Sequence, residues 1–306
     1  MSDSHLFAAA SDRLGRRPRL ATAILRLPAL LPGGPRSRLY RSFSWPLAKR
    51  LRAEAEVSVA GGSRMLVRTD DSVGRVLAIS GVWEPNVTAA FGRQLAPGDV
   101  CVDVGGHIGY YTLLASRLVG PEGHVYAFEP SPVNYRALSS NLARNGVANV
   151  TALQVAVGAT ATRAELHEGP GTNTGGATLS PLLAARRGGQ PAVEVEVRPL
   201  ADNIPEADWP RIRVVKIDVE GYEVDVLEGL APILERATRL AVFVELSPKW
   251  LPEIPGYVEG FCRRQGFEAK RLRTGYTLDA LFPSELSEPE KVDSIPTEHC
   301  DLLLTR

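Results

Sequence analysis

The chain has 306 residues, of which 44% are hydrophobic, so it is long enough to bury a sizeable core. Lys and Arg total 35, as do Asp and Glu, and the resulting formal net charge of zero argues against bulk electrostatic capture of nucleic acid. Cys101, Cys262 and Cys300 form no CxxC pair, which argues against a disulfide framework or a zinc site and favours a reducing cytoplasm. No uninterrupted apolar run reaches about 18 residues, so we expect no transmembrane helix.

The first region, residues 1–54, is rich in arginine. Nine Arg lie between Arg13 and Arg50, and Asp12 is the one acidic residue that follows Asp3 within the first fifty. This composition predicts a helical arm with a solvated basic face. The alternative is a docking surface for an anionic partner, a membrane or a carrier protein, and the sequence does not decide between the two.

The second region, residues 55–97, is predicted to form a small β element that leads into the main domain. Short apolar pieces occur at 57–59, 65–67 and 76–79. Glycine and aspartate pairs at 61–62 and 70–71 separate these pieces, and such pairs are typical of turns between strands.

From residue 98 to 306 the pattern changes to alternating strands and helices. Apolar runs predict buried strands, and segments with helical spacing or caps predict helices between them. The predicted strands are 100–104, 124–128, 150–155, 214–219 and 240–246, with an edge strand at 193–197 and closing strands at 268–272 and 301–304. The predicted helices are 110–118, 132–144, 223–230 and 258–265. Repeated strand–helix units require a mostly parallel sheet with helices on both faces, which is a Rossmann-like α/β fold.

A glycine-rich segment follows the first strand of this domain and precedes its first helix. It reads Asp103-Val104-Gly105-Gly106-His107-Ile108-Gly109. Glycines let the backbone turn sharply and approach a ligand at the carboxyl ends of the strands. The dinucleotide pattern G-x-G-x-x-G fails, because His107 occupies its second glycine position when counted from Gly105. Asp103 would repel a phosphate but suits the cationic S-adenosylmethionine; a plain turn or helix-terminal carboxylate is its alternative interpretation.

A second acidic residue ends the next strand. Glu129, followed by Pro130 and Ser131, lies 20 residues after Gly109. An acid at this place accepts hydrogen bonds from ribose hydroxyls in nucleotide-binding α/β folds, so we assign Glu129 that role. After the third strand, Ala156 and Val157 lie where an adenine ring would reach.

Taken together, these motifs resemble the FkbM-type methyltransferase family over roughly residues 80–247. The resemblance rests on the glycine segment, on Phe128-Glu129-Pro130-Ser131-Pro132 and above all on Lys216-Ile217-Asp218-Val219-Glu220-Gly221-Tyr222-Glu223. It implies a class I methyltransferase fold, whose seven-stranded sheet has an antiparallel last strand, and S-adenosylmethionine as the methyl donor. Members are commonly O-methyltransferases of sugars, polyketides or other secondary metabolites. The first fifty residues match nothing in this resemblance.

Methyl transfer to a hydroxyl requires alignment of the acceptor and a general base. Asp218 and Glu220 follow the fourth strand, at the mouth of the predicted site, and Glu245 ends the next strand. Asp218 is the first candidate for holding the donor's ammonium group or acting as base, and Glu220 is the second candidate, as substrate binder or base. Lys216 points to the same strand face as Asp218 and could pair with a carboxylate or stabilise an alkoxide.

Two alternatives remain open for these charged residues. Lys216 and Asp218 could form a structural ion-pair network with Glu223. Asp218, Glu220 and Glu245 could instead hold Mg²⁺, although we expect no metal.

Three further groups of residues have weaker assignments. His107 is expected to pack against the donor, with a role as base as the alternative. The long segment 169–189 contains Asn173 and Thr174, which could read acceptor hydroxyls if the segment folds over the substrate. Trp83 and Glu84 precede the first strand of the domain and could form part of a lid over the donor.

The leading function is therefore methyl transfer from S-adenosylmethionine to a hydroxyl of a small metabolite or a glycan. A non-catalytic module that binds the donor and a NAD-dependent oxidoreductase are the alternatives. A nucleic-acid substrate is not expected, because the charge is neutral and no N-P-P-Y-type motif for a flipped base is present.

Overall fold

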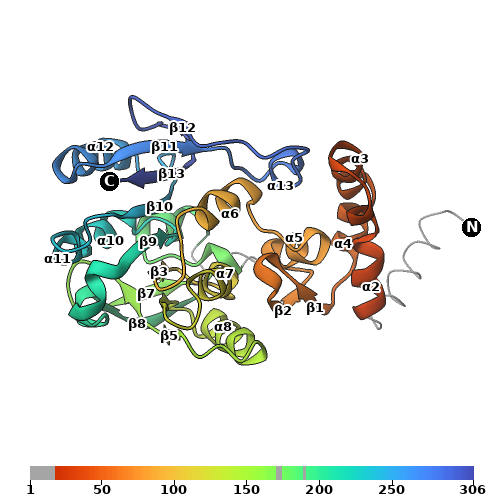
Figure 1. Cartoon of the computed structure of the whole chain (residues 1–306), viewed down its shortest axis with the longest axis horizontal. Helices are drawn as coiled ribbons and strands as arrows, with labels where there is room; N and C mark the ends of the chain where they lie inside the picture. Colours follow the sequence, from red (N-terminus) through yellow and green to blue (C-terminus); the bar gives the residue numbers. More distant parts are fainter. Residues whose placement is uncertain (1–17, 170–173, 189–190) are drawn as a thin grey trace, which may run out of the picture. The chain divides into compact units, whose positions relative to one another are not determined.

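The computed structural model of the chain describes residues 18–169, 174–188 and 191–306 (Figure 1). The described residues divide into two compact units. The arm unit comprises residues 18–88 and 274–286, and the core unit comprises residues 89–273 and 287–306. Within the part of the chain that the structure describes, no helix is both long enough and apolar enough to span a membrane.

The core unit is built on one large sheet of eight strands. In spatial order these are β12 (Glu290–Lys291), β11 (Glu268–Leu272), β13 (Cys300–Thr305), β10 (Ala241–Leu246), β9 (Ile212–Ile217), β3 (Val100–Val104), β4 (His124–Phe128) and β5 (Val150–Leu153). The strands from β10 to β5 run parallel, and β13 runs antiparallel between β10 and β11. The predicted α/β class is confirmed. The expected count of seven strands is one too low, because the two-residue edge strand β12 carries no apolar pattern.

Strand β3 occupies the position that matters most for a binding site. It pairs with β4 on one side and with β9 on the other, although β9 comes much later in the chain. All five residues of β3 are buried, as expected for a central parallel strand. The chain therefore changes direction across the sheet between β3 and β9, and ligands of open α/β sheets bind at the carboxyl ends of strands at such a switch point.

Helices cover both faces of the large sheet. On one face, α10 (Glu223–Gly229), α11 (Ala231–Leu234) and α12 (Ile254–Gln265) pack into one buried cluster with alternate residues of the central strands. On the other face, α6 (Pro85–Gly92) and α7 (Tyr110–Val119) contribute Phe91 and Tyr111. The ring centroids of Phe91 and Phe243 of β10 lie 5.5 Å apart, and those of Phe91 and Tyr111 lie 5.2 Å apart.

Local sequence signals set the ends of several helices. Helix α8 (Pro132–Arg144) begins after Ser131, whose hydroxyl accepts a hydrogen bond from the backbone N–H of Asn134, and it has proline at its first position. Helix α12 ends at Gly266, which has a left-handed φ of 72°. The predictions of these two helix ends are confirmed. Helix α9 (Pro181–Arg186) begins in the same way after Ser180.

A second, three-stranded sheet also belongs to the core unit. Its order is β6 (Ala156–Val157), β8 (Ala192–Arg198) and β7 (Thr162–His167). The strand predicted at 193–197 is present as β8, but it is the central strand of this small sheet rather than an edge strand. Its alternation of valine and glutamate reflects one buried face, with Val195 and Val197, and one solvated face.

The arm unit consists of short helices and one hairpin. Its helical elements are α2 (Pro18–Leu25), η1 (Leu27–Leu30), α3 (Gly33–Leu39), η2 (Tyr40–Ser44), α4 (Trp45–Arg50), η3 (Ala60–Gly62), α5 (Ser72–Ser80) and α13 (Leu278–Leu281). The predicted small β element is represented by the antiparallel strands β1 (Glu54–Ser58) and β2 (Arg64–Arg68).

The strand predicted at 76–79 is wrong, because these residues lie in helix α5. The Asp71 carboxylate caps the helix by accepting a hydrogen bond of 2.8 Å from the backbone N–H of Gly74. Gly81 ends the helix in a left-handed conformation with a φ of 75°. A short apolar run buried on all sides has no periodicity that separates strand from helix, and these two end signals decide the outcome.

Candidate active site

The glycine loop, residues 103–109, begins with the last two residues of β3 and leads into α7. The backbone N–H groups of Gly105 and Gly106 donate to the carbonyl of Phe128, at 2.9 and 3.0 Å, which joins the loop to the end of β4. Gly105 has a φ of 86°, and a Cβ atom placed on it would lie 1.9 Å from the backbone oxygen of Asp218. Gly105 is therefore required for the close approach of two backbone segments. Gly106 and Gly109 instead face the side chain of Leu138.

Asp103 lies at the end of β3 with its side chain buried. The hydroxyl of Thr112 in α7 donates a hydrogen bond of 2.6 Å to Asp103 Oδ2. Burial raises the pKa of Asp103, and the nearby Lys216 ammonium opposes this rise. The predicted strand-tip carboxylate is thus tied to the helix that follows the loop.

Glu129, at the end of β4, fixes the shape of the glycine loop. Its Oε2 accepts a hydrogen bond of 2.8 Å from the backbone N–H of His107, and its Oε1 accepts one of 2.9 Å from the backbone N–H of Ser131. Burial raises the pKa of Glu129 to about 7, although these hydrogen bonds oppose the rise. Sequence reasoning assigned Glu129 to a ribose and missed this anchoring of the loop. Pro130 and Ser131 continue directly into α8.

His107 connects the glycine loop to a distant segment. It has a positive φ of 49°, and its ring Nε2 lies 2.8 Å from the hydroxyl oxygen of Thr174. The side-chain amide of Asn134 donates to the backbone oxygen of Thr174 at 2.9 Å. Two residues that the sequence singled out separately, His107 and Thr174, are therefore in contact. Asn173, which was predicted to act with Thr174, lies outside the described residues.

The carboxylate loop, residues 216–223, runs from the last two residues of β9 to the first residue of α10 and lies beside the glycine loop. Lys216 Nζ lies 2.7 Å from Asp218 Oδ2, and the ammonium also sits over the ring of Tyr111, 4.7 Å from its centroid. Burial acts to raise the pKa of Asp218, but the Lys216 charge and hydrogen bond outweigh burial and hold it below its ordinary value. Asp218 is therefore held in its ionised form. Its backbone N–H donates to the carbonyl of Val104 at 3.0 Å, which joins the two loops.

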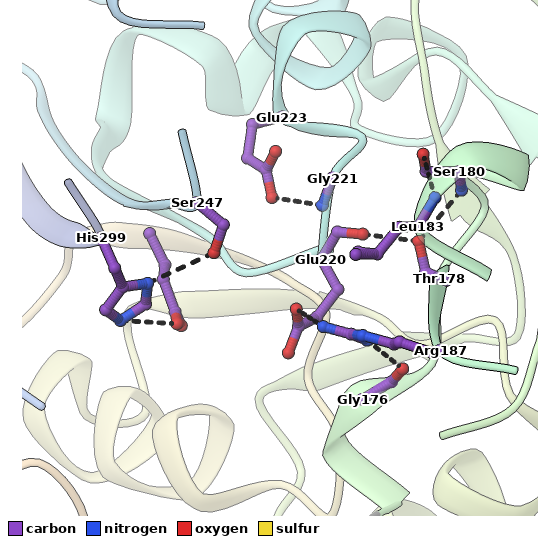
Figure 2. A network of polar contacts seen from close by, with 11 residues as sticks. Gly176, Thr178, Ser180, Leu183, Arg187, Glu220, Gly221, Glu223, Ser247 and His299 are labelled. Carbon is purple, nitrogen blue, oxygen red and sulfur yellow. Dashed lines mark hydrogen bonds and ion pairs between the residues drawn. The ribbon is translucent and has the colours of Figure 1, made fainter. Parts of the chain in front are cut away.

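Glu220 pairs with a residue that sequence reasoning had not assigned to the site (Figure 2). Its Oε2 lies 2.8 Å from Nη2 of Arg187, and Nη1 of Arg187 donates to the backbone oxygen of Gly176 at 2.7 Å. The hydroxyl of Thr178 donates to the backbone oxygen of Glu220 at 2.5 Å. Burial raises the pKa of Glu220, and the Arg187 charge opposes this rise. The segment 176–187 is thus fastened to the carboxylate loop.

Glu223 begins α10 and is almost fully buried. Its Oε1 accepts a hydrogen bond of 2.8 Å from the backbone N–H of Gly221, and its Oε2 has no hydrogen-bond partner among the described residues. Burial raises its pKa to about 7, and the charges of Glu220 and Asp218 add to this effect. Of the three residues in the alternative of a structural network, Lys216 and Asp218 form an ion pair, whereas Glu223 has no ion pair among the described residues.

Glu245, near the end of β10, faces a histidine from the segment before β13. His299 Nε2 lies 3.4 Å from Glu245 Oε1. His299 Nδ1 lies 3.2 Å from the Ser247 hydroxyl oxygen (Figure 2). A side-chain contact with Glu245 also helps to lower the pKa of Asp218. Among the described residues, Asp218, Glu220 and Glu245 do not bring one oxygen each within 4.8 Å of one another, so they do not form a three-carboxylate metal site in this arrangement.

The remaining predicted residues belong to other elements of the chain. Ala156 and Val157 form β6 of the small sheet, where both side chains are buried in apolar clusters. Their predicted place beside an adenine therefore depends on their backbone groups. Trp83 and Glu84 belong to the arm unit, and their role as a lid stays a prediction.

The site residues that the sequence did not reveal have contact partners far away in the sequence. Arg187 and Thr178 lie in the long segment that was predicted to fold over the substrate, and the unusual length of that segment was the available signal. His299 was not assigned to the site, because nothing in its neighbourhood in the sequence connects it with Glu245.

Comparison with known proteins identifies relatives of this chain. The model of the methyltransferase FkbM domain matches residues 103–269. Methyltransferase sdnD of Sordaria araneosa is 31% identical over 205 residues, which cover 58% of this chain and 77% of that protein. The 31-O-demethyl-FK506 methyltransferase FkbM of Streptomyces tacrolimicus is 36% identical over 163 residues, which cover 45% of this chain and 62% of that protein. The hexuronic acid methyltransferase AglP of Haloferax volcanii is 25% identical over 207 residues, which cover 65% of this chain and 78% of that protein.

Proposed function

The chain belongs to the methyltransferase FkbM domain family, and from this premise we propose that it methylates a hydroxyl group of a secondary metabolite or a glycan. Its methyl donor is S-adenosylmethionine. When bound, this cofactor supplies an electrophilic methyl group on a positively charged sulfur.

The residues of the glycine loop fit such a donor. Asp103 and Glu129 are buried carboxyl groups at adjacent strand ends, and among the described residues neither forms an ion pair with Lys or Arg. Residues 103–109 and 128–135 contain no Lys or Arg, which a pyrophosphate would favour. Glu129 retains lone pairs beyond those used by the two backbone N–H groups, so it can accept hydrogen bonds from ribose hydroxyls. We assign Asp103, Glu129 and Asp218 to donor binding, with Gly105, Gly106, His107, Gly109, Pro130 and Ser131 shaping the loop and Ala156 and Val157 on the adenine side.

The observation that carries O-methylation is the different state of the two acids in the carboxylate loop. Asp218 is held ionised by Lys216, which suits permanent attraction of the donor's ammonium group but makes a weak base. Burial raises the pKa of Glu220 above its ordinary value, and a higher pKa makes a carboxylate a stronger general base. We therefore assign Glu220 to remove the proton of the acceptor hydroxyl. Lys216 acts as a positioning residue for Asp218, and Glu245 supports Asp218 from β10.

The acceptor class rests on the relatives together with the charge of the chain. One relative acts on demethyl-FK506 and another on a hexuronic acid, so hydroxylated small molecules and sugars are the first substrates to test. The formal net charge of zero supports such an acceptor over a nucleic acid.

Two other functions make different predictions. A module that binds the donor without catalysis would retain Asp103 and Glu129 but would turn over no acceptor. A NAD-dependent oxidoreductase would bind a dinucleotide at the glycine loop, which the family membership and the failed G-x-G-x-x-G pattern both disfavour.

The test is a transfer assay with donor labelled by ¹³C at the methyl group and a panel of polyketide, hexose and hexuronic acid acceptors. We expect a product whose labelled carbon gives a methoxy resonance in a proton–carbon correlation spectrum. A labelled N-methyl or C-methyl product would contradict O-methylation. Parallel reactions with a chelator test the Mg²⁺ alternative, for which the rate would fall and would recover on addition of Mg²⁺.

A further inference from the structure

Exposed apolar side chains are concentrated in the arm unit. Eight of the eleven large hydrophobic side chains that are exposed in the described residues belong to it, although it is the smaller unit. These eight are Leu20, Leu27, Leu30, Leu31, Leu39, Phe43, Tyr276 and Leu286. Leu30 is the most exposed of them, at 84%. Single exposed apolar side chains need no explanation, but five leucines and one phenylalanine within the 24 residues 20–43 indicate a surface that meets an apolar environment.

These exposed side chains do not result from an incompletely folded arm. Arg26 donates hydrogen bonds to the backbone oxygens of Leu77, Ala78 and Ser58, which ties the arm to α5 and β1. Buried residues of the arm form a separate apolar set: Ala21, Leu25, Tyr40, Leu47, Ala48 and Leu51. The rings of Tyr40 and Phe282 lie 5.4 Å apart, so the segment around α13 packs on the same helices. The arm therefore has an apolar interior and a second apolar set that faces solvent.

The same stretch carries a strong positive charge. Residues 13–53 contain ten Arg and one Lys and no Asp or Glu, so the rest of the chain has a net charge of −11. Arg38, Lys49, Arg50 and Arg52 are exposed. Arg38 lies in α3 next to the exposed Leu39, whereas Lys49 and Arg50 lie in α4 and Arg52 follows that helix. A chain that is neutral overall is thus strongly polarised along its length.

We propose that the arm unit binds to the surface of an anionic phospholipid bilayer. Leucine and aromatic side chains that enter the boundary between headgroups and acyl chains, with arginine and lysine beside anionic lipids, are the features of interfacial helices. A second copy of the chain is the wrong occupant, since a symmetric contact would bring the same cationic segment of each copy together. The phosphate groups of a nucleic acid would pair with the arginine and lysine side chains, but the exposed leucines would then have no function. The proposal is independent of the methyl acceptor.

The test is co-sedimentation of the full chain with vesicles. One set contains phosphatidylcholine alone, and the other contains equal parts of phosphatidylcholine and phosphatidylglycerol. We expect binding to the anionic vesicles, weakened by added salt, and little binding to the neutral ones. The double variant Leu27→Ser/Leu30→Ser should bind the anionic vesicles at least about tenfold more weakly than the unchanged protein. Leu182→Ser, which changes a leucine of similar exposure in α9 of the core unit, should bind like the unchanged protein.

Three results would overturn the proposal. The first is no binding to anionic vesicles, and the second is equal binding of the double variant. The third is a dimer in sedimentation velocity that the double variant abolishes while vesicle binding is unchanged, which would assign the leucines to self-association. Because Leu27 and Leu30 are solvent-exposed, the double variant should keep the circular dichroism spectrum of the unchanged protein, and that measurement excludes unfolding as the cause of lost binding.

Discussion

The glycine loop and the carboxylate loop lie at the ends of neighbouring strands, but their acidic side chains have different kinds of partner. In the glycine loop and the strand end beside it, Asp103 and Glu129 accept hydrogen bonds from a hydroxyl and from backbone N–H groups. In the carboxylate loop, Asp218 and Glu220 each pair with a cation. The first region keeps buried acids available to a positively charged ligand, whereas the second has its charges balanced within the protein. This difference supports donor binding through Asp103 and Glu129, with the ionised Asp218 of the second loop beside them, and leaves Glu220 as the acid assigned to proton transfer.

The largest effect is expected from Glu220→Gln. Loss of a general base should lower kcat by about 10²–10⁴-fold, while the KM for the donor changes little. The pH–rate profile should also lose the limb that follows ionisation of Glu220. Glu194→Gln is the matched control, because Glu194 forms a 2.6 Å ion pair with Arg163 on the exposed surface. An unchanged kcat in Glu220→Gln would show that Glu220 does not take the proton from the acceptor hydroxyl.

The contact between the two loops can be broken at Gly105. A methyl group on this residue would collide with the backbone oxygen of Asp218, so Gly105→Ala should lower the free energy of unfolding by about 3 kcal/mol or more. Gly98 has a similar φ of 89° but nothing lies within 4 Å of a Cβ placed there. Gly98→Ala should therefore cost about 1 kcal/mol, from backbone strain alone. Equal losses for the two variants in urea titrations would show that the loops are not in close contact.

A pH-dependent effect is expected from Glu223. Burial raises its pKa from 4.5 to about 7 in the folded protein, so the stability that this group contributes is fully present below pH 4.5 and is lost as the pH rises through 7. Glu223→Gln keeps a neutral side chain at every pH. Between about pH 5 and 8, the free energy of unfolding of the unchanged protein should fall by on the order of 2–3 kcal/mol more than that of the variant. Parallel pH dependences of the two proteins would contradict a raised pKa.

The smallest effect concerns the contact of the glycine loop with the segment that begins at Thr174. Thr174→Val removes the hydroxyl next to His107 and should cost about 1 kcal/mol of stability. His124 and Thr151 form a contact of the same 2.8 Å length on the exposed surface. Thr151→Val should cost less, because water replaces its hydroxyl. Thermal unfolding of both variants would show whether the part-buried contact is the stronger one.

Much of the fold could be predicted from the sequence because its signals are local. Buried parallel strands such as β3 are short apolar runs, and α8 has its cap, proline and terminal residues in the sequence itself. The prediction failed at α5, where an apolar run without periodicity fits a strand equally well. It also missed β12, whose two charged residues are placed by pairing with β11 rather than by their own pattern.

The candidate site, like the fold, could be predicted only where its signals are local in the sequence. The glycine loop and Glu129 could be located because a turn and an acid at fixed spacing form a local motif. Arg187 and His299 could not be assigned, because their partners Glu220 and Glu245 lie far away in the sequence. The ends of parallel strands meet only once the sheet is formed, so residues that act across them leave no local signal.

Titration of S-adenosylhomocysteine by calorimetry, with three forms of the protein, tests the division of roles most directly. We predict that Asp103→Asn raises the Kd at least about tenfold, since it removes a buried carboxylate that would face the ammonium group of the ligand, while Glu220→Gln binds within about twofold of the unchanged protein. The reverse order, with Glu220→Gln weakened and Asp103→Asn unaffected, would contradict the assignment of the donor to the glycine loop.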